Sequence, residues 1–265
     1  MPKLSILIPA RNEKYLQNTI DDIFKHAEGD TEVIVGLDGE KGDWIEKRHK
    51  HRKEKTIRLD KSIGQRAMTN KLAKVSEAKW IMKLDAHVSF KQGFDVAMLD
   101  KMEKDMVMTP MLLRLDVKNW QIIPKPFTKK YYFNTKLIME YGKAEDEIND
   151  WGLVETMTLQ GSCFMVEREN WWKWNLCDES WGSWGCQGIE VATKTWFNGG
   201  RVVTNTDTFY GHMFRGEGQV VKEIPYVRPK KEVAHAYKSC KEHLKNPKFK
   251  QLLEKFDWPC DWVDN

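Results

Sequence analysis

The chain has 265 residues, of which 41% are hydrophobic and 31% are charged, and this is the composition of an ordinary globular protein. A chain of this length can bury a full core in one domain, with room for a small appendage. The formal net charge of +4 is too small to indicate a nucleic-acid partner by itself. The basic cluster at residues 47–53 has two interpretations that the sequence leaves open, a solvated helix face or a contact with a polyanion.

Neither the cysteines nor the hydrophobic segments indicate the secretory pathway. The cysteines are five, widely spaced and without metal-site spacing, so we expect reduced thiols at Cys163, Cys177, Cys186, Cys240 and Cys260. The N-terminus leads directly into a strand-like segment without a secretory apolar region. No apolar run reaches the roughly 18 residues that a membrane span needs. We therefore expect a cytoplasmic protein that has no membrane span.

The N-terminal part of the chain alternates between two patterns. Short apolar runs that end in Pro, Asp or Gly predict buried strands, and stretches with apolar residues at helical spacing separate them. Strands are expected at 4–9, 32–37, 57–59 and 80–84, and helices at 12–28 and 64–75. This rhythm is typical of βαβ units and predicts an α/β fold with a doubly wound, mostly parallel sheet.

The C-terminal part is less regular. Residues 112–156 contain prolines and scattered aromatic residues, and we interpret them as a connecting excursion. Beyond them, strands are expected at 158–166 and 202–203, and helices at 168–174, 188–197 and 233–244.

Three predicted parallel strands end in segments that carry polar or charged side chains. The segments are Pro9-Ala10-Arg11, Asp38-Gly39 and Asp85-Ala86-His87. Because ligands of open α/β sheets bind beyond the carboxyl ends of the strands, we expect these three segments to converge on one crevice.

Asp85 and His87 stand two residues apart, so in an extended segment both side chains point to the same side and can bind one divalent cation. Alone, Asp-x-His arises often by chance. A second histidine, His212, could complete the ligand set, and Arg215 offers a permanent planar charge for phosphate. One carboxylate and two imidazoles suit Mn²⁺ better than Ca²⁺. The alternative is a pair of unrelated core or surface histidines that never meet.

Several segments in order resemble the GT-A glycosyltransferases of family 2. They are PARNE (9–13), GLDG (36–39), GQRAMTNKLA (64–73) and KLDAH (83–87), and Asp-x-His instead of Asp-x-Asp is the variant found in polypeptide N-acetylgalactosaminyltransferases. Segments of those enzymes are also similar to LQGSCFMVERENWW (159–172), WGSWGCQGIEVATKTWFNGG (181–200) and GHMFR (211–215). The resemblance covers about residues 4–226 and implies transfer of a sugar from a UDP-sugar to a hydroxyl acceptor.

The resemblance also implies a domain plan. A GT-A catalytic domain would span 1–226, with a nucleotide-binding half at 1–111 and an acceptor half at 112–226, and a Lys-rich C-terminal extension would span 227–265.

Each matching position receives an expected role from the resemblance. The nucleoside would be contacted by Pro9, Ala10, Glu13 and Asp38, and Asp38 would read its uracil ring. The ligands of Mn²⁺ (or Mg²⁺) would be Asp85, His87 and His212. The rest of the donor and the acceptor would be contacted by Arg66, Trp184, Gln187, Glu190 and Arg215. Simpler roles stay open for Asp38 as a turn former, for Glu190 as a solvent-facing helical acid, and for Arg66 as a helical residue without a function.

One position departs from the family pattern. Inverting members place a Glu-Asp pair after the Trp-Gly segment, and the Asp deprotonates the acceptor, but the equivalent residues here are Gln187 and Gly188. Because Gly188 has no side chain, it cannot act as a base. We expect retention of configuration by a front-face route, in which the leaving phosphate takes the acceptor proton. The alternative is inversion with Glu190 or Asp207 as an unusual base.

The acceptor surface is expected in residues 112–156 and in the C-terminal tail. Lysines there alternate with aromatic residues, at Trp120, Lys125, Lys129, Lys130, Tyr131 and Tyr132. This mixture suits bases stacked beside phosphates and equally suits sugars, so hydroxymethylated pyrimidine in phage-type DNA and saccharide, lipid-linked or protein hydroxyls all stay candidates. Two further classes remain, a non-catalytic GT-A relic that binds nucleotide or DNA and a nucleotidyltransferase.

Overall fold

A computed structural model of the chain describes residues 1–39, 53–142, 152–214 and 229–258. Residues 47–52 of the basic cluster, Arg215 and Cys260 therefore lie outside the described residues. The helices are α1 (Leu16–His26), α2 (Gln65–Val75), α3 (Phe94–Asp100), α4 (Arg168–Lys173), the 3-10 helix η1 (Glu179–Trp181), α5 (Gln187–Phe197), α6 (Lys230–His243) and α7 (Lys248–Lys255). The helices predicted from the sequence are thus confirmed, with ends that differ by a few residues.

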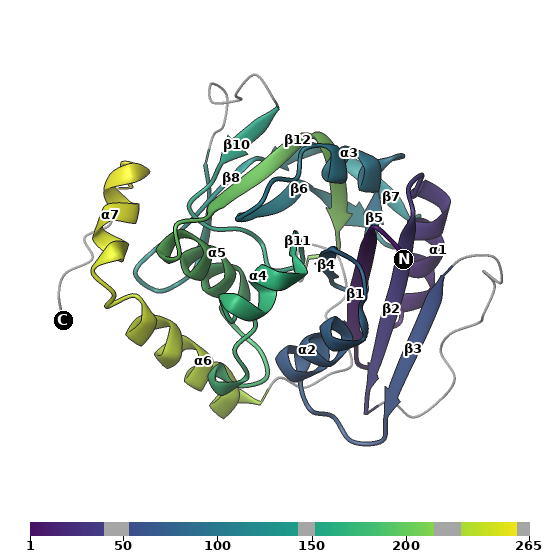
Figure 1. Cartoon of the computed structure of the whole chain (residues 1–265), viewed down its shortest axis with the longest axis horizontal. Coiled ribbons are helices and arrows are strands. Elements are labelled where there is room, and N and C mark those ends of the chain that lie inside the picture. Colours follow the sequence, from purple (N-terminus) through teal and green to yellow (C-terminus); the bar gives the residue numbers. More distant parts are fainter. Residues whose placement is uncertain (40–52, 143–151, 215–228, 259–265) are drawn as a thin grey trace.

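The strands are β1 (Leu4–Ala10), β2 (Thr31–Asp38), β3 (Glu54–Leu59), β4 (Trp80–Leu84), β5 (Val88–Phe90), β6 (Met106–Asp116), β7 (Gln121–Thr128), β8 (Lys130–Phe133), β9 (Met139–Gly142), β10 (Leu153–Glu155), β11 (Cys163–Glu167) and β12 (Arg201–His212). Within the described ranges, ten of them form one sheet whose main path is β10-β12-β6-β11-β4-β1-β2-β3. β5 pairs with β12 and β7 with β6, while β8 and β9 form a separate two-stranded sheet. Figure 1 shows the sheet running through the middle of the molecule.

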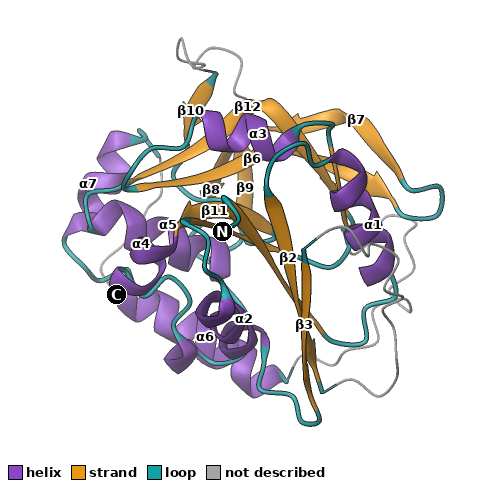
Figure 2. Cartoon of the chain, turned by 45° about the vertical axis from the view of Figure 1, so that its right-hand side comes forward, coloured by secondary structure: helices purple, strands orange, loops and turns teal. Residues whose placement is uncertain are grey.

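The strands β4, β1, β2 and β3 are parallel neighbours, as the sequence predicted. Side chains alternate between the two faces of this part of the sheet. Ile6 packs in the same cluster as Ile20 of α1, whereas Leu7 packs in the cluster of Leu72 of α2. Helices therefore cover both faces, as Figure 2 shows, and the expected α/β sheet is confirmed.

The interpretation of residues 112–156 as a connecting excursion is wrong. The described part of this segment completes β6 and forms β7 to β10. Its prolines lie in β7, which pairs with β6 alone among the described strands, and an edge strand tolerates the missing N–H of proline. β12 is also much longer than the predicted strand at 202–203, because it follows β6 in parallel over most of its length.

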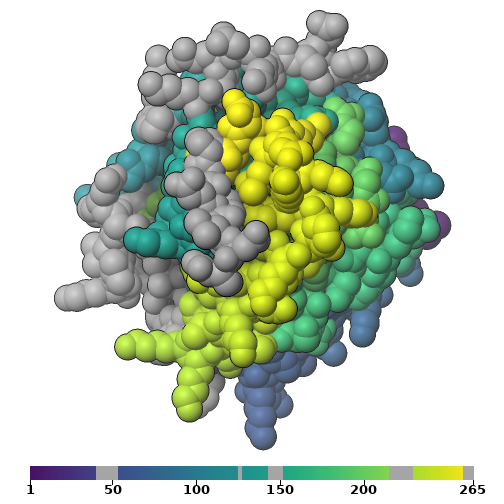
Figure 3. Space-filling view, turned by 90° about the vertical axis from the view of Figure 1, so that its left-hand side faces the viewer, coloured from purple at the N-terminus to yellow at the C-terminus, as the bar shows by residue number. Residues whose placement is uncertain are grey.

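The described part of the C-terminal segment packs against α5. Cys240 and Leu244 of α6 and Leu252 of α7 share one apolar cluster with Ile189 and Phe197 of α5. In Figure 3 the yellow residues of α6 and α7 cover this face of the molecule. None of the helices in the described ranges is long and apolar enough to cross a membrane.

Candidate active site

Two adjoining cavities open at the carboxyl ends of the parallel strands. The first is lined by the ends of β1, β2 and β4 and by residues that follow them, including Pro9, Ala10, Glu13, Asp38, Asp85 and His87. The convergence predicted from the sequence is therefore present. Trp184 lines this cavity from the loop before α5 and also lines the second cavity.

Asp85, His87 and His212 meet at the boundary of the first cavity. One potential ligand atom from each lies within 4.8 Å of the others. Asp85 directly follows β4, His87 lies two residues further on, and His212 is the last residue of β12. His212 pairs with Val88 of β5, which brings it beside His87. The alternative of two histidines that never meet is thus wrong, since the two rings lie 4.9 Å apart between centroids.

The donor set of this cluster fits a divalent transition-metal ion. His212 Nε2 lies 3.4 Å from Asp85 Oδ2. Neither ring nitrogen of His212 has a hydrogen-bond partner among the described residues, although both are buried. A buried polar atom without a partner is costly, and coordination of an ion would remove that cost. Burial lowers the pKa of His212, which keeps its imidazole neutral and able to bind a metal.

Glu13 orients His87, a role that the sequence did not suggest. Its Oε2 lies 3.2 Å from His87 Nδ1, so the other ring nitrogen, Nε2, is the one available to an ion. Burial lowers the pKa of His87, but the hydrogen bond and the charge of Glu13 outweigh burial and raise the pKa above its usual value. Glu13 also lines the first cavity, where the resemblance had placed it beside a nucleoside.

Asp85 is held on one side by two polar side chains. Lys83 Nζ donates to its Oδ1, and Gln65 Nε2 lies 3.4 Å from the same oxygen. Burial alone would raise the pKa of Asp85, but the Lys83 ammonium and the contact with His212 hold it well below its usual range. The carboxylate stays ionised, with Oδ2 facing His212.

Asp38 lines the first cavity and also fixes a loop. Its Oδ2 accepts hydrogen bonds from Ser62 Oγ at 2.7 Å and Gly64 N at 2.9 Å, and its Oδ1 accepts one from Ile63 N at 2.7 Å. The proposed contact with a uracil ring stays a prediction. What the structure adds is that Asp38 shapes the edge of the cavity that leads into α2.

The second cavity has a volume of about 300 Å³, within the range of small-ligand sites. It shares Gln65, Asp85 and Trp184 with the first cavity, so the two cavities meet beside Asp85, His87 and His212, which we call the Asp85–His87–His212 cluster. Its floor includes Lys83, Gly161 and Gln187, and its outer wall includes Ile138 and Tyr237. Gln187 thus lines the cavity, as expected, and its Nε2 lies 3.5 Å from Cys177 Sγ.

At Gly188, where inverting family members carry an Asp, the neighbouring backbone leaves no space for a side chain. A Cβ on Gly188 would lie 1.9 Å from the carbonyl oxygen of Leu159. A carboxylate is therefore not simply absent at residue 188 but sterically excluded.

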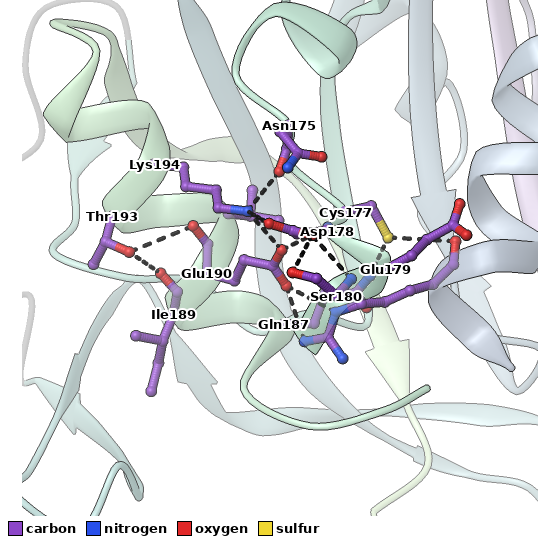
Figure 4. Close-up of polar contacts among 12 residues, drawn as sticks. Asn175, Cys177, Asp178, Glu179, Ser180, Gln187, Ile189, Glu190, Thr193 and Lys194 are labelled. Carbon is purple, nitrogen blue, oxygen red and sulfur yellow. Dashed lines mark hydrogen bonds and ion pairs between the residues drawn. The ribbon is translucent and has the colours of Figure 1, made fainter. Parts of the chain in front are cut away.

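Arg66 and Glu190 do not line either cavity, contrary to the roles expected from the resemblance. Arg66 Nε and Nη2 each lie 2.9 Å from Glu190 Oε2, and both side chains are buried. Oε1 of Glu190 accepts from Lys194 Nζ at 2.9 Å and from Asp178 N at 2.7 Å, as Figure 4 shows. Arg66 also donates to the carbonyls of Gly182 and Gly185, which flank Trp184. We call this set the Arg66–Glu190 cluster.

The simpler interpretation of Glu190 as a solvent-facing acid is equally wrong, because Glu190 is 0% exposed, and its partner Arg66 is 1% exposed. The partners are 124 residues apart in sequence, and no local pattern encodes their pairing.

The other candidate base, Asp207, lies away from both cavities. Its side chain is 50% exposed and pairs with Lys101. Among the described carboxylates, Asp85 alone lines the second cavity.

The expected basic and aromatic acceptor surface is largely absent from the described residues. Tyr131 and Lys130 are buried, and Tyr132 stacks on Trp258 with 4.1 Å between ring centroids. Trp120 donates from Nε1 to Asp22 Oδ2 and packs beside Tyr15. These side chains therefore pack into the fold, and Lys130 and Tyr131 are neighbours in β8 that are both buried.

The sequence model of Glycosyl transferase family 2 matches residues 5–184. The chain belongs to this family. Polypeptide N-acetylgalactosaminyltransferase 5 of Caenorhabditis elegans is 22% identical over 253 residues, which cover 85% of this chain and 38% of that protein. The chain thus spans well under half the length of that curated relative.

Solved structures show the same fold. The chain resembles GalNAc-T7 with UDP, GalNAc and Mn²⁺ with a TM-score of 0.73 at 16% identity, covering 96% of this chain and 50% of that one. It resembles residues 1–349 of S. aureus TarS in complex with UDP-GlcNAc with a TM-score of 0.62 at 16% identity, covering 96% and 71%. The GT-A fold expected from the sequence is confirmed.

Proposed function

We propose that this chain is a metal-dependent glycosyltransferase that moves a sugar from a UDP-sugar to a hydroxyl acceptor. One observation carries the proposal: Asp85, His87 and His212 meet beside the two cavities, and the buried ring nitrogens of His212 have no hydrogen-bond partner among the described residues, although Nε2 lies 3.4 Å from Asp85 Oδ2. The solved relatives support the donor class, since one contains UDP, GalNAc and Mn²⁺ and another UDP-GlcNAc.

In this proposal the nucleoside occupies the first cavity and the sugar the second. The diphosphate then crosses the shared edge beside Asp85. Mn²⁺, or Mg²⁺, would be held by Asp85, His87 and His212 and would supply Lewis-acid neutralisation of the diphosphate. Trp184 lines both cavities and would cover the link between sugar and nucleotide. Arg215 lies outside the described residues, and its contact with the diphosphate stays a proposal.

We propose that the anomeric configuration is retained. The bond between the anomeric carbon and the β-phosphate oxygen breaks, the acceptor oxygen bonds to the same face, and its proton passes to the departing phosphate oxygen. This route needs no protein base. It is supported by the closed backbone at Gly188, by the fully bonded carboxylate of Glu190 and by the distance of Asp207 from the described cavities.

The acceptor hydroxyl would enter past the outer wall of the second cavity. Ile138 of the turn between β8 and β9 lines this wall and is exposed, and Tyr237 of α6 lies on the same wall. An apolar rim of this kind suits the carbon face of a sugar. Modified DNA remains a separate acceptor to be tested, with less support now that the predicted aromatic residues are buried or stacked.

Hydrolysis and transfer assays test the function directly. Purified protein is incubated with UDP-glucose, UDP-galactose, UDP-GlcNAc and UDP-GalNAc, with Mn²⁺ or with a chelator, and UDP release is measured. We expect metal-dependent UDP release from at least one donor, and its loss in Asp85→Ala. Binding of UDP without any turnover would favour a relic, and release that persists with the chelator would refute the metal-dependent mechanism.

Two further assays refine the substrate and the mechanism. Oligosaccharides, hydroxymethylated DNA and plain DNA are offered with the active donor, and incorporation identifies the acceptor class. Proton NMR of the first-formed product reports its anomeric coupling. An inverted product would rule out the front-face route.

A further inference from the structure

Lys83 places a buried positive charge at the second cavity, beside Asp85, which lines both cavities. The side chain is 1% exposed, and Nζ donates to Asp85 Oδ1 and, at 2.6 Å, to the carbonyl oxygen of Gly161. Lys83 precedes Asp85 by two residues on β4, so both side chains point to the same side of the sheet. The ammonium therefore contacts Asp85 of the Asp85–His87–His212 cluster on one side and Gly161, which lines the second cavity, on the other.

The charges around the three metal ligands depend on this residue. Glu13 contacts His87, and Lys83 contacts Asp85. With both imidazoles neutral, Asp85, Glu13 and Lys83 carry a net charge of −1, and a divalent ion would raise it to +1. Without Lys83 the same groups would carry −2, and the ion would only bring them to zero. Within this group of residues, the net positive charge that remains for a diphosphate depends on Lys83.

We propose that Lys83 makes metal and diphosphate binding interdependent. This inference rests on the proposed UDP-sugar donor. Before the donor arrives, the ammonium competes with the ion for Asp85 and repels it, so the ion alone binds weakly. Once the ion is present, the ammonium adds to the attraction for the diphosphate and for the extra negative charge that develops when UDP departs. Lys83 thus has opposite effects on the two ligands.

The opposite effects of Lys83 on the affinity for the ion and on the affinity for the diphosphate distinguish an electrostatic role from a structural one. A residue that only held Asp85 in position would, on removal, weaken the ion and the nucleotide together. A residue that supplies charge would, on removal, strengthen the ion and weaken the nucleotide. Measuring both affinities on the same variants therefore tests the inference without reference to turnover.

The experiment compares Lys83→Met, which removes the charge and keeps an unbranched side chain, with Lys83→Arg, which keeps the charge. Lys79→Met is the matched control, because Lys79 precedes β4 at the opposite end of the strand, is 65% exposed and pairs with Glu167. Binding of Mn²⁺ without nucleotide is followed by the electron paramagnetic resonance signal of the free ion. Binding of UDP at saturating Mn²⁺ is followed by calorimetry.

In Lys83→Met we expect Mn²⁺ alone to bind about tenfold more tightly and UDP to bind about tenfold more weakly. Lys83→Arg should keep most of the UDP affinity, and Lys79→Met should resemble the wild type for both ligands. Loss of both affinities in Lys83→Met, or no change in either, would overturn the inference. If Lys83→Met does not fold by circular dichroism, Lys83→Gln is measured with the same criteria.

The wild-type protein separates this inference from the proposed function. If wild-type protein does not bind UDP in the presence of Mn²⁺, the proposed donor class fails and the inference fails with it. If the wild type binds UDP and the charge-removing variant Lys83→Met does not show opposite shifts, the inference about Lys83 fails alone.

Discussion

The Asp85–His87–His212 cluster and the Arg66–Glu190 cluster both bury polar or charged side chains, yet they differ in how completely those side chains are hydrogen-bonded. Both oxygens of Glu190 are bonded, to Arg66, Lys194 and a backbone N–H. The nitrogens of His212 have no hydrogen bond within the described structure. A satisfied buried cluster needs nothing more and acts as a support, whereas an unsatisfied one indicates a ligand. The unmet bonding capacity distinguishes the two more clearly than burial does.

The largest effect is expected in the Arg66–Glu190 cluster. Arg66→Met removes the partner of a fully buried carboxylate and should lower the free energy of unfolding by about 3–5 kcal/mol. Urea denaturation measures this loss, and Lys71→Met, an exposed change on the same helix, is the control. A loss no larger than that of the control would mean that the cluster does not support the fold.

In the Asp85–His87–His212 cluster, a substitution should lower activity strongly and leave the stability of the fold unchanged or higher. His212→Ala removes a proposed ligand and should lower metal-dependent UDP release by at least about a hundredfold. Because the nitrogens of His212 lack partners in the described structure, the melting temperature of the metal-free protein should stay the same or rise. His26→Ala on α1 is the control for both measurements. A large drop in melting temperature in His212→Ala would place His212 with the structural residues.

A substitution at Glu13 tests whether metal binding by the Asp85–His87–His212 cluster depends on a residue that orients His87. Glu13→Ala leaves His87 free to rotate and should weaken Mn²⁺ binding by about 10-fold to 100-fold. The affinity is measured by calorimetry in the presence of UDP. An unchanged affinity for Mn²⁺ combined with a weaker affinity for UDP would instead support the nucleoside contact that the resemblance implied.

The smallest effect concerns His243, a partly buried histidine in the last turn of α6. Burial lowers the pKa of His243 to about 4, and its ring packs 5.5 Å from Trp181 and 5.0 Å from Phe197 between centroids. Since the unfolded chain takes up this proton near pH 6.5, the folded state loses stability as the pH falls from about 6.5 towards 4. His243→Phe should remove part of this acid sensitivity in melting curves. An identical pH dependence of the two melting temperatures would exclude His243 as its source.

The sequence predicted best those features that depend on neighbouring residues. Asp85 and His87 share one side of an extended segment, and the ends of parallel strands meet at one edge of the sheet. The position of the Asp85–His87 pair beside a cavity could therefore be anticipated. Residues 112–156 could not, because β6 pairs in parallel with β12, which lies far along the chain. Lys83 was missed although it has the same two-residue spacing from Asp85 that identified His87.

Arg66 and Glu190 show a different limit. Their positions match the family pattern, but a pattern does not give the direction in which a side chain points. Both turn inward to meet each other, and only the folded chain shows that they hold the loop of Trp184 instead of facing a substrate.

The close contact between Gly188 and Leu159 also bears on how the proposed active site could be redesigned. A carboxylate cannot be installed at residue 188 by one substitution, since even a methyl group would overlap the neighbouring carbonyl oxygen. Conversion to chemistry that uses a protein base would require a shift of the strand entry at Leu159 or of the first turn of α5. The exclusion of a side-chain base at residue 188 is thus built into the main chain, where point mutagenesis has little access.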